Sequence, residues 1–188
     1  MTLSVLDPKP ALVVIDLQKG ITTYPTVHPV DDVVRRTAEL AAAFRSHGLP
    51  VVLVNATGGA PGRTDGGFGG SGRARPADSA DLLAELDPQP GDLRVTKQTW
   101  GAFHETSLHA MLQELGVTQV VVTGIATSFG VESTARSAHE HGYHVVLATD
   151  AMTDMDAESH RNSLERVFPR LGESTTTPEI IELLAKTR

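Results

Sequence analysis

Two side chains of this 188-residue sequence, Asp16 and Lys97, are of the types that move protons. Asp16 follows the apolar run 11–15, and Lys97 ends a short β-like run just before Trp100, the single tryptophan. A carboxylate at the end of a buried strand is partly desolvated, so its pKa tends upward and it can act as a general acid or base near neutral pH. The alternatives are a strand-end Asp that only makes hydrogen bonds and a solvated surface lysine. A pairing of the two groups would favour chemistry.

The segment 124–134 could hold an anion or a developing oxyanion. It reads Gly-Ile-Ala-Thr-Ser-Phe-Gly-Val-Glu-Ser-Thr and leads from an apolar run through a glycine turn into a helical pattern. Thr127 or Ser128 can cap the predicted helix, and the free N–H groups of a helix start favour negative charge. Amides in this position can stabilise an oxyanion. An ordinary capped helix start has the same spacing, so both interpretations stay open.

The composition excludes several kinds of site. With no cysteine, the chain has no disulfide, no Cys-ligated zinc, no iron–sulfur cluster and no thiol nucleophile. The eight histidines show no metal-ligand spacing, so we expect no metal and no cofactor. The 16 Lys+Arg against 23 Asp+Glu give a formal net charge of −7, which argues against a nucleic-acid partner. No apolar stretch approaches the roughly 20 residues of a membrane span and no signal-peptide pattern opens the chain, so we expect a cytoplasmic protein without membrane association.

Short apolar runs alternate with longer helical patterns along the chain. Runs that are apolar throughout are typical of strands buried on both faces of a parallel sheet. The predicted strands are 12–15, 51–54, 119–123 and 144–148, and the predicted helices are 32–47, 107–115, 128–141, 157–168 and 178–184. This alternation predicts an α/β fold with a doubly wound sheet, in a single domain over residues 1–188. Ligands bind such sheets at the carboxyl ends of the strands, where Asp16 and the segment 124–134 lie.

A glycine-rich segment interrupts this alternation. Residues 57–72 hold eight of the 17 glycines, and we expect a flexible loop over about 57–75. Such a loop is either a lid over a site or a surface insertion, and the sequence leaves both open.

An acidic group follows the fourth predicted strand. It comprises Asp150, Asp154 and Asp156, and the next helical pattern begins at residue 157. An Asp just before a helix accepts hydrogen bonds from the unpaired N–H groups of the first turn. We therefore expect Asp154 or Asp156 to cap that helix.

Four stretches, in this order, resemble the isochorismatase-like hydrolase superfamily. They are residues 11–18 (Ala-Leu-Val-Val-Ile-Asp-Leu-Gln), Lys97 followed by Trp-Gly-Ala-Phe at 100–103, the segment 124–134, and residues 142–151 (Gly-Tyr-His-Val-Val through Asp-Ala). The resemblance covers about residues 10–184 and implies a three-layer α/β/α sandwich with a mostly parallel, doubly wound sheet. It also implies hydrolase activity and a cis peptide bond between Ile125 and Ala126.

Many members of the superfamily are amidases, such as nicotinamidases, which use an Asp, a Lys and a nucleophilic Cys. The matching positions here are Asp16, Lys97 and Gly130, so the two charged groups are present and the thiol is not. Without a thiol, the thioester route is closed. Ser128 and Ser133 are nearby hydroxyls, but at helical spacing they point away from the nucleophile position. An amide hydrolase with another nucleophile is one alternative.

The isochorismatase branch also carries glycine at this position, so the chain resembles it at Gly130. The reaction of that branch hydrolyses an enol ether and releases pyruvate, with the Asp as general acid and no covalent intermediate. The resemblance therefore implies that Asp16 protonates a small, anionic substrate of the isochorismate type and that Lys97 tunes Asp16. A further alternative is a catalytically inactive member that binds a ligand or a partner.

Substrate contacts are expected from the same turn and from the neighbouring strand ends. The candidates are Gln18, Asn55, Arg63, Trp100, Ile125, Ala126 and Phe129. Arg63 is the candidate for a bidentate clamp on a carboxylate. The chain departs from isochorismatases at Ala126, where they carry Tyr, and after the second strand, so the identity of the small-molecule substrate stays open. As in the superfamily, we expect a homo-oligomer, a dimer or larger.

Overall fold

All strand pairings in the central sheet are parallel. The computed structural model describes residues 3–60, 62–65 and 76–187, and these form a six-stranded sheet in the order β3-β2-β1-β4-β5-β6. The strands are β1 (Pro10–Ile15), β2 (Val51–Ala56), β3 (Leu93–Lys97), β4 (Gln119–Ile125), β5 (His144–Thr153) and β6 (Glu173–Thr175). The strand order reverses between β1 and β4. This confirms the predicted α/β fold with a doubly wound sheet and places its switch point between these two strands.

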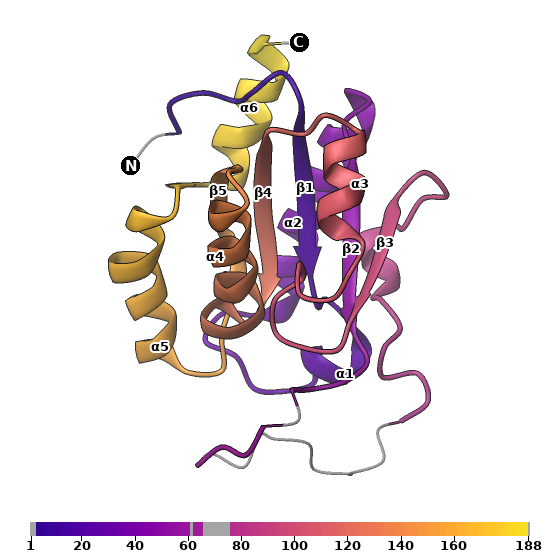
Figure 1. Ribbon diagram of the computed structural model, residues 1–188, viewed down its shortest axis with the longest axis vertical. Helices are drawn as coiled ribbons and strands as arrows, with labels where there is room; N and C mark the ends of the chain where they lie inside the picture. Colours follow the sequence, from indigo (N-terminus) through magenta and orange to yellow (C-terminus); the bar gives the residue numbers. More distant parts are fainter. Residues whose placement is uncertain (1–2, 61, 66–75, 188) are drawn as a thin grey trace.

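Helices cover both faces of the sheet, which confirms the three-layer arrangement (Figure 1). They are α1 (Lys19–Thr22), α2 (Val30–Ser46), α3 (Leu108–Glu114), α4 (Glu132–Glu140), α5 (Ala157–Asn162) and α6 (Thr177–Thr187). Apolar residues of α2 and α6 share one core cluster, and those of α3 and α4 share the other. The helices predicted over 128–141 and 157–168 are present, but each contains a π-helical turn, Thr127–Val131 in the first and Ser163–Val167 in the second. Within the described ranges, no helix is long and apolar enough to cross a membrane.

The central strands form because their residues are apolar and mostly β-branched. In β1, Leu12 and Val14 face the layer of α2 and α6, while Val13 and Ile15 face the layer of α3 and α4. The four predicted strands are confirmed, each with longer bounds. The edge strand β6 was not predicted, because its sequence Glu-Ser-Thr contains no apolar run.

Much of the glycine-rich segment lies outside the described residues. Residues 61 and 66–75 are not described, so the prediction of a flexible loop over 57–75 concerns mainly this part of the chain. The chain that returns after it packs beside α1, where the Gly20 N–H donates to Ser79 O at 2.9 Å. A Cβ at Gly20 would lie 2.7 Å from the Ser79 Cβ, so this close approach requires glycine.

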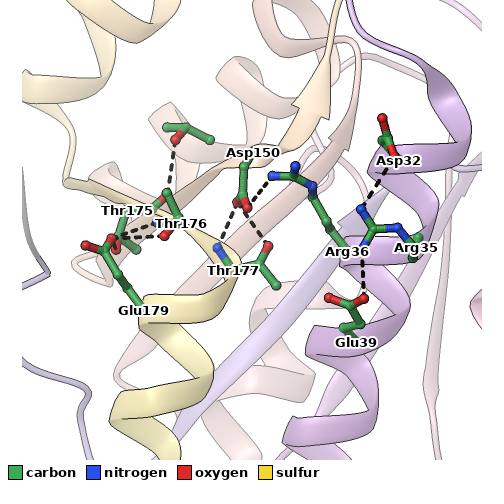
Figure 2. Close-up of polar contacts among 10 residues, drawn as sticks. Asp32, Arg35, Arg36, Glu39, Asp150, Thr175, Thr176, Thr177 and Glu179 are labelled. Atoms are coloured by element: carbon green, nitrogen blue, oxygen red, sulfur yellow. Dashed lines mark hydrogen bonds and ion pairs between the residues drawn. The ribbon is translucent and has the colours of Figure 1, made fainter.

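A bulge in β5 ties the sheet to α2 and α6. The register between β4 and β5 shifts between Val122 and Gly124, and Asp150 lies in the extra stretch of β5. Its Oδ1 accepts hydrogen bonds from the Thr177 N–H at 2.8 Å and from the Thr177 hydroxyl at 3.0 Å, while its Oδ2 pairs with Arg36 at 2.6 Å (Figure 2). Asp150 therefore caps the start of α6 and holds α2 against the sheet.

Candidate active site

Asp16 lies at the carboxyl end of β1, at the switch point of the sheet. Its backbone N–H donates to Val54 O at 3.0 Å, but its φ of 54° ends the extended conformation. Strict alternation after Ile15 would send the next side chain toward the layer of α2. The left-handed conformation redirects the carboxylate, which meets Lys97. A non-glycine residue in this conformation carries a conformational cost, and such residues cluster at functional sites.

Asp16 and Lys97 form a buried ion pair. Lys97 Nζ lies 2.7 Å from Asp16 Oδ2 and also donates to Thr99 O at 3.1 Å. The side chains of Lys97 and Asp16 are 3% and 7% exposed. The residue beside Lys97 in β2 is Ala56, and its small side chain leaves the lysine room to reach across that strand. Asp16 and Lys97 are therefore paired, which is the condition under which the sequence favoured a chemical role for them.

The two carboxyl oxygens of Asp16 have different surroundings. Oδ2 accepts from Lys97, whereas Oδ1 is buried and has no hydrogen-bond partner among the described residues. Burial raises the pKa of Asp16 to about 6, although the charge and the hydrogen bond of Lys97 lower it. Buried polar atoms without a partner are uncommon in folded proteins. Oδ1 is therefore the oxygen that a proton can occupy when the carboxyl group is neutral, because Lys97 holds the other.

Gly130 faces this carboxylate from the π-helical turn Thr127–Val131. A Cβ built at residue 130 would lie 3.1 Å from Asp16 Oδ2 and 2.9 Å from Ile15 Cγ2. Residue 130 is therefore adjacent to the carboxylate, and the packing around it fits glycine more closely than any larger residue. The peptide bond between Ile125 and Ala126, just before the turn, is cis, which confirms that expectation.

Four of the expected substrate contacts lie in or beside this turn. Trp100 packs edge-on against Phe129, with ring centroids 4.9 Å apart and an interplanar angle of 71°. Trp100 is 49% exposed, whereas Ile125 and Ala126 are buried. These four residues therefore lie within or next to the turn that faces Asp16, and the ring of Trp100 is partly exposed to solvent.

The other three expected substrate contacts are engaged or placed elsewhere. The Gln18 amide accepts from the Ala56 N–H at 2.7 Å and donates to the carbonyls of Ala56 and Ser79, so it links β2 to the returning chain. Asn55 hydrogen-bonds to the same returning chain and to β3. Arg63 is exposed and forms no ion pair within the described part of the chain.

Two residues beside the turn were not predicted to contact it. Asp154 follows β5 directly and accepts from the Ser128 N–H at 2.7 Å, and His160 Nδ1 lies 2.9 Å from Thr127 Oγ1. The predicted fourth strand ended at residue 148, so Asp154 was not recognised as a strand-end group.

Asp156 caps α5, which confirms one of the two predicted caps. No group of three or more His, Asp or Glu among the described residues is arranged to hold a metal ion.

Comparisons with known proteins identify the family. The Isochorismatase domain model matches residues 10–179. The chain is 42% identical to the uncharacterized isochorismatase family protein YwoC of Bacillus subtilis, over 96% of this chain and 97% of that protein. It is 29% identical to maleamate amidohydrolase of Pseudomonas putida, over 94% and 87% of the two chains. The structure of an isochorismatase family protein from Burkholderia thailandensis has a TM-score of 0.92 and 39% identity, over 98% of this chain and 100% of that one. The chain therefore belongs to the isochorismatase-like hydrolase family.

Proposed function

We propose that this chain hydrolyses a small anionic substrate by proton transfer from Asp16, without a covalent enzyme intermediate, as in the hydrolysis of an enol ether of the isochorismate type. The observation that carries the proposal is the state of Asp16. Its pKa is raised to about 6, Lys97 holds Oδ2, and Oδ1 has no partner among the described residues. Roughly a tenth of such a group is still protonated at about pH 7, which is enough for general acid catalysis.

In the proposed reaction, protonated Asp16 gives its proton to the terminal vinyl carbon of the enol ether. The electrons of the C=C bond form the new C–H bond, which leaves an oxocarbenium ion at the ether carbon. Water adds to that carbon, and the proton it releases returns to Asp16. The hemiketal then breaks its ether C–O bond and yields pyruvate and an alcohol. Lys97, 2.7 Å from Oδ2, stabilises the carboxylate that the first step creates.

Gly130 supports a route without a covalent intermediate. The chain contains no cysteine, and a glycine occupies the position in the turn that faces Asp16. A nucleophilic side chain there would need a Cβ only 2.9 Å from Ile15 Cγ2, so the present packing does not accept one. Water that attacks an activated substrate removes the need for a side-chain nucleophile.

The aromatic pair beside the turn indicates where the substrate would pack. Trp100 and Phe129 offer ring surfaces next to the turn, and Lys97 supplies a positive charge at Asp16. This combination suits a small molecule with an apolar body and an anionic group. We also propose a homo-oligomer in the cytoplasm, and size-exclusion chromatography with light scattering would measure the oligomer size.

The proposal is tested by pyruvate release from isochorismate, coupled to lactate dehydrogenase. We expect steady NADH consumption with the wild-type protein and only background with Asp16→Asn. Asp150→Asn is the matched control, because it makes the same change at a carboxylate that binds α2 and α6. Absence of pyruvate with wild-type protein would exclude isochorismate as the substrate.

A second candidate is amide hydrolysis, which the likeness to maleamate amidohydrolase favours. Ser128 Oγ is buried and has no hydrogen-bond partner among the described residues, so no base activates it as a nucleophile. Water would have to attack the amide directly, with ionised Asp16 as the base. The two candidates therefore differ in pH dependence, because acid catalysis is lost and base catalysis gained as the pH rises through about 6. Ammonia release from maleamate, followed across this range, distinguishes them.

The remaining alternative is a catalytically inactive member that binds a ligand or a partner. A buried ion pair is weak evidence for stability, because the cost of desolvating two charges offsets much of their attraction. Retention of Asp16 and Lys97 therefore favours chemistry over a purely structural pair. A higher Tm of Asp16→Asn, together with no turnover of either substrate class, would favour the binding alternative.

A further inference from the structure

Asp154 is a fully buried carboxylate that forms no ion pair with any described lysine or arginine. Its Oδ2 accepts from the Ser128 N–H at 2.7 Å, and its Oδ1 accepts from the N–H groups of Met155 and Asp156 at 2.8 and 3.3 Å. A buried charge is costly unless hydrogen bonds compensate for lost hydration. Backbone N–H groups supply that compensation here, and one of them belongs to the turn beside Asp16.

A second buried contact supports the same turn from α5. His160 Nδ1 lies 2.9 Å from Thr127 Oγ1, which itself donates to Thr153 O at 3.1 Å. Because the single hydroxyl hydrogen of Thr127 is used on that carbonyl, His160 Nδ1 is the donor in its contact with Thr127. Burial, followed by the charge of His28, lowers the pKa of His160 although the charge of Asp154 acts in the opposite direction, so the neutral ring prevails near pH 7.

Both contacts hold the first residues of a turn whose later part covers Asp16. The Val131 N–H donates back to Ala126 O at 3.1 Å, so the turn is closed on itself. A Cβ at Gly130 would lie 3.1 Å from Asp16 Oδ2, which places the backbone of the turn against the carboxylate. A displacement at the start of the turn would therefore change the burial of Asp16.

We propose that Asp154 is a positioning residue for Asp16, because it anchors the turn that covers the carboxylate through the Ser128 N–H, and that His160 supports the same anchor through Thr127. The inference rests on the proposed function, in which the burial of Asp16 raises its pKa and so keeps part of the carboxyl protonated near neutral pH. Release of the turn would admit water to Asp16 and lower its pKa toward the ordinary range.

Asp154→Asn removes the anchor at constant volume. The asparagine oxygen can keep the hydrogen bonds to residues 155 and 156, while its NH₂ group replaces Oδ2 opposite the Ser128 N–H and cannot accept from it. The matched control is Asp156→Asn, because Asp156 caps α5 through the Ser159 N–H and Asn caps a helix about equally well.

The primary measurement is the NMR titration of the Asp16 carboxyl carbon, with turnover followed in parallel. We expect Asp154→Asn to lower the pKa of Asp16 by about one unit and kcat/KM by roughly 10- to 100-fold, while Asp156→Asn changes neither. An unchanged Asp16 pKa in folded Asp154→Asn overturns the proposal, whether or not turnover falls. The titration needs no substrate, so a shifted pKa in a protein that hydrolyses neither isochorismate nor maleamate would support the positioning role and contradict the proposed function alone.

His160 gives a second test if Asp154→Asn does not fold. His160→Asn places an amide N–H near the position of Nδ1 and should keep the contact with Thr127, whereas His160→Gln places it near Nε2 and should lose the contact. We expect the Asp16 pKa to stay near the wild-type value in His160→Asn and to fall in His160→Gln. Equal Asp16 pKa values in the two variants would overturn the role of this contact.

Discussion

Asp16 and Asp150 are two carboxylates of one sheet with opposite hydrogen-bond states. Each pairs with a basic residue of another element, Lys97 of β3 in one case and Arg36 of α2 in the other. Both oxygens of Asp150 accept hydrogen bonds, with Thr177 supplying two of them (Figure 2). Asp16 has a positive φ and one buried oxygen that has no hydrogen-bond partner among the described residues.

This difference in hydrogen bonding indicates that Asp150 stabilises the fold, whereas Asp16 has an oxygen that no hydrogen bond occupies. At Asp150 both oxygens are used in hydrogen bonds that fix α2 and α6 on the sheet. At Asp16 the larger effect is burial, which raises its pKa to about 6 in spite of the adjacent lysine. Perturbed pKa values of this origin, in a group with an unfilled hydrogen-bonding atom, are typical of catalytic residues.

Replacement of each carboxylate by an amide should give the largest contrast. Asp16→Asn removes the proposed proton donor and should lower kcat/KM about 10²- to 10⁴-fold in a folded protein. Asp150→Asn should leave kcat/KM of the folded protein unchanged and lower the unfolding free energy by about 1–2 kcal/mol, because Arg36 loses its charged partner. Steady-state kinetics and urea unfolding measure the two effects. Similar losses of turnover in both variants would contradict the distinction.

Removal of the lysine from the buried pair should have the next largest effect. Lys97→Met abolishes both influences that lower the pKa of Asp16, so this pKa should rise above about 6. Asp16 in the folded wild type is mostly protonated below about pH 6, so the wild type and the variant respond alike to pH up to that value. Above about pH 6 the wild-type carboxylate ionises beside Lys97, whereas in the variant it stays protonated or is charged without a partner. The unfolding free energy of the variant should therefore fall increasingly below that of the wild type as the pH rises above about 6, with roughly 1 kcal/mol of additional loss by about pH 7. Urea unfolding at several pH values checks this, and a deficit that does not depend on pH would argue against the assignment.

Addition of one methyl group at the turn should have a smaller effect. In Gly130→Ala the new Cβ would meet Ile15 Cγ2 at 2.9 Å and Asp16 Oδ2 at 3.1 Å, so the turn must shift away from the carboxylate. We expect a loss of about 1–3 kcal/mol in unfolding free energy and a roughly tenfold loss of turnover. Gly91→Ala is the control, because its Cβ would have no described neighbour within 4 Å. Thermal unfolding and steady-state kinetics should show a lower Tm and a lower kcat/KM for Gly130→Ala than for Gly91→Ala. Equal values in the two variants would show that residue 130 is not closely packed.

Replacement of Arg36, the basic partner of Asp150, should have the smallest effect. Arg36 is 36% exposed, so its pair with Asp150 is partly screened by solvent. Arg36→Met should lower the unfolding free energy by about 0.5–1 kcal/mol and leave the titration of Asp16 unchanged. Calorimetry and carboxyl NMR test both parts. A shift in the Asp16 pKa in this variant would indicate that the two regions are coupled.

The sequence predicted the central sheet well and its irregular parts poorly, for physical reasons. Continuous apolar runs can bury both faces of a strand, so β1 and β4 were predictable, whereas β6 carries no such pattern. The π-helical turn Thr127–Val131 has a composition that an α-helical start shares, so only its three-dimensional contacts reveal it.

The site was predictable in its charged residues but not in their surroundings. Asp16 and Lys97 are 81 residues apart, and their contact depends on the order of β1, β2 and β3. The direction of a side chain after a strand end depends on local dihedral angles. The amide of Gln18 therefore turned to β2 although spacing alone allowed it to face Asp16. Asp154 was considered only as a helix cap, and its contact with Ser128 was missed because β5 continues through a bulge that no sequence pattern indicates.

The most direct test of Asp16 as the acid is the pH dependence of kcat/KM of the wild-type protein on the substrate identified in the coupled assay. The protonated carboxyl is the active form, so we predict a plateau at low pH and a tenfold fall per pH unit above an apparent pKa of about 6. The residual activity of Asp16→Asn should not show this fall in kcat/KM above about pH 6. A rate that rises through pH 6, or that does not change there, would contradict acid catalysis by Asp16.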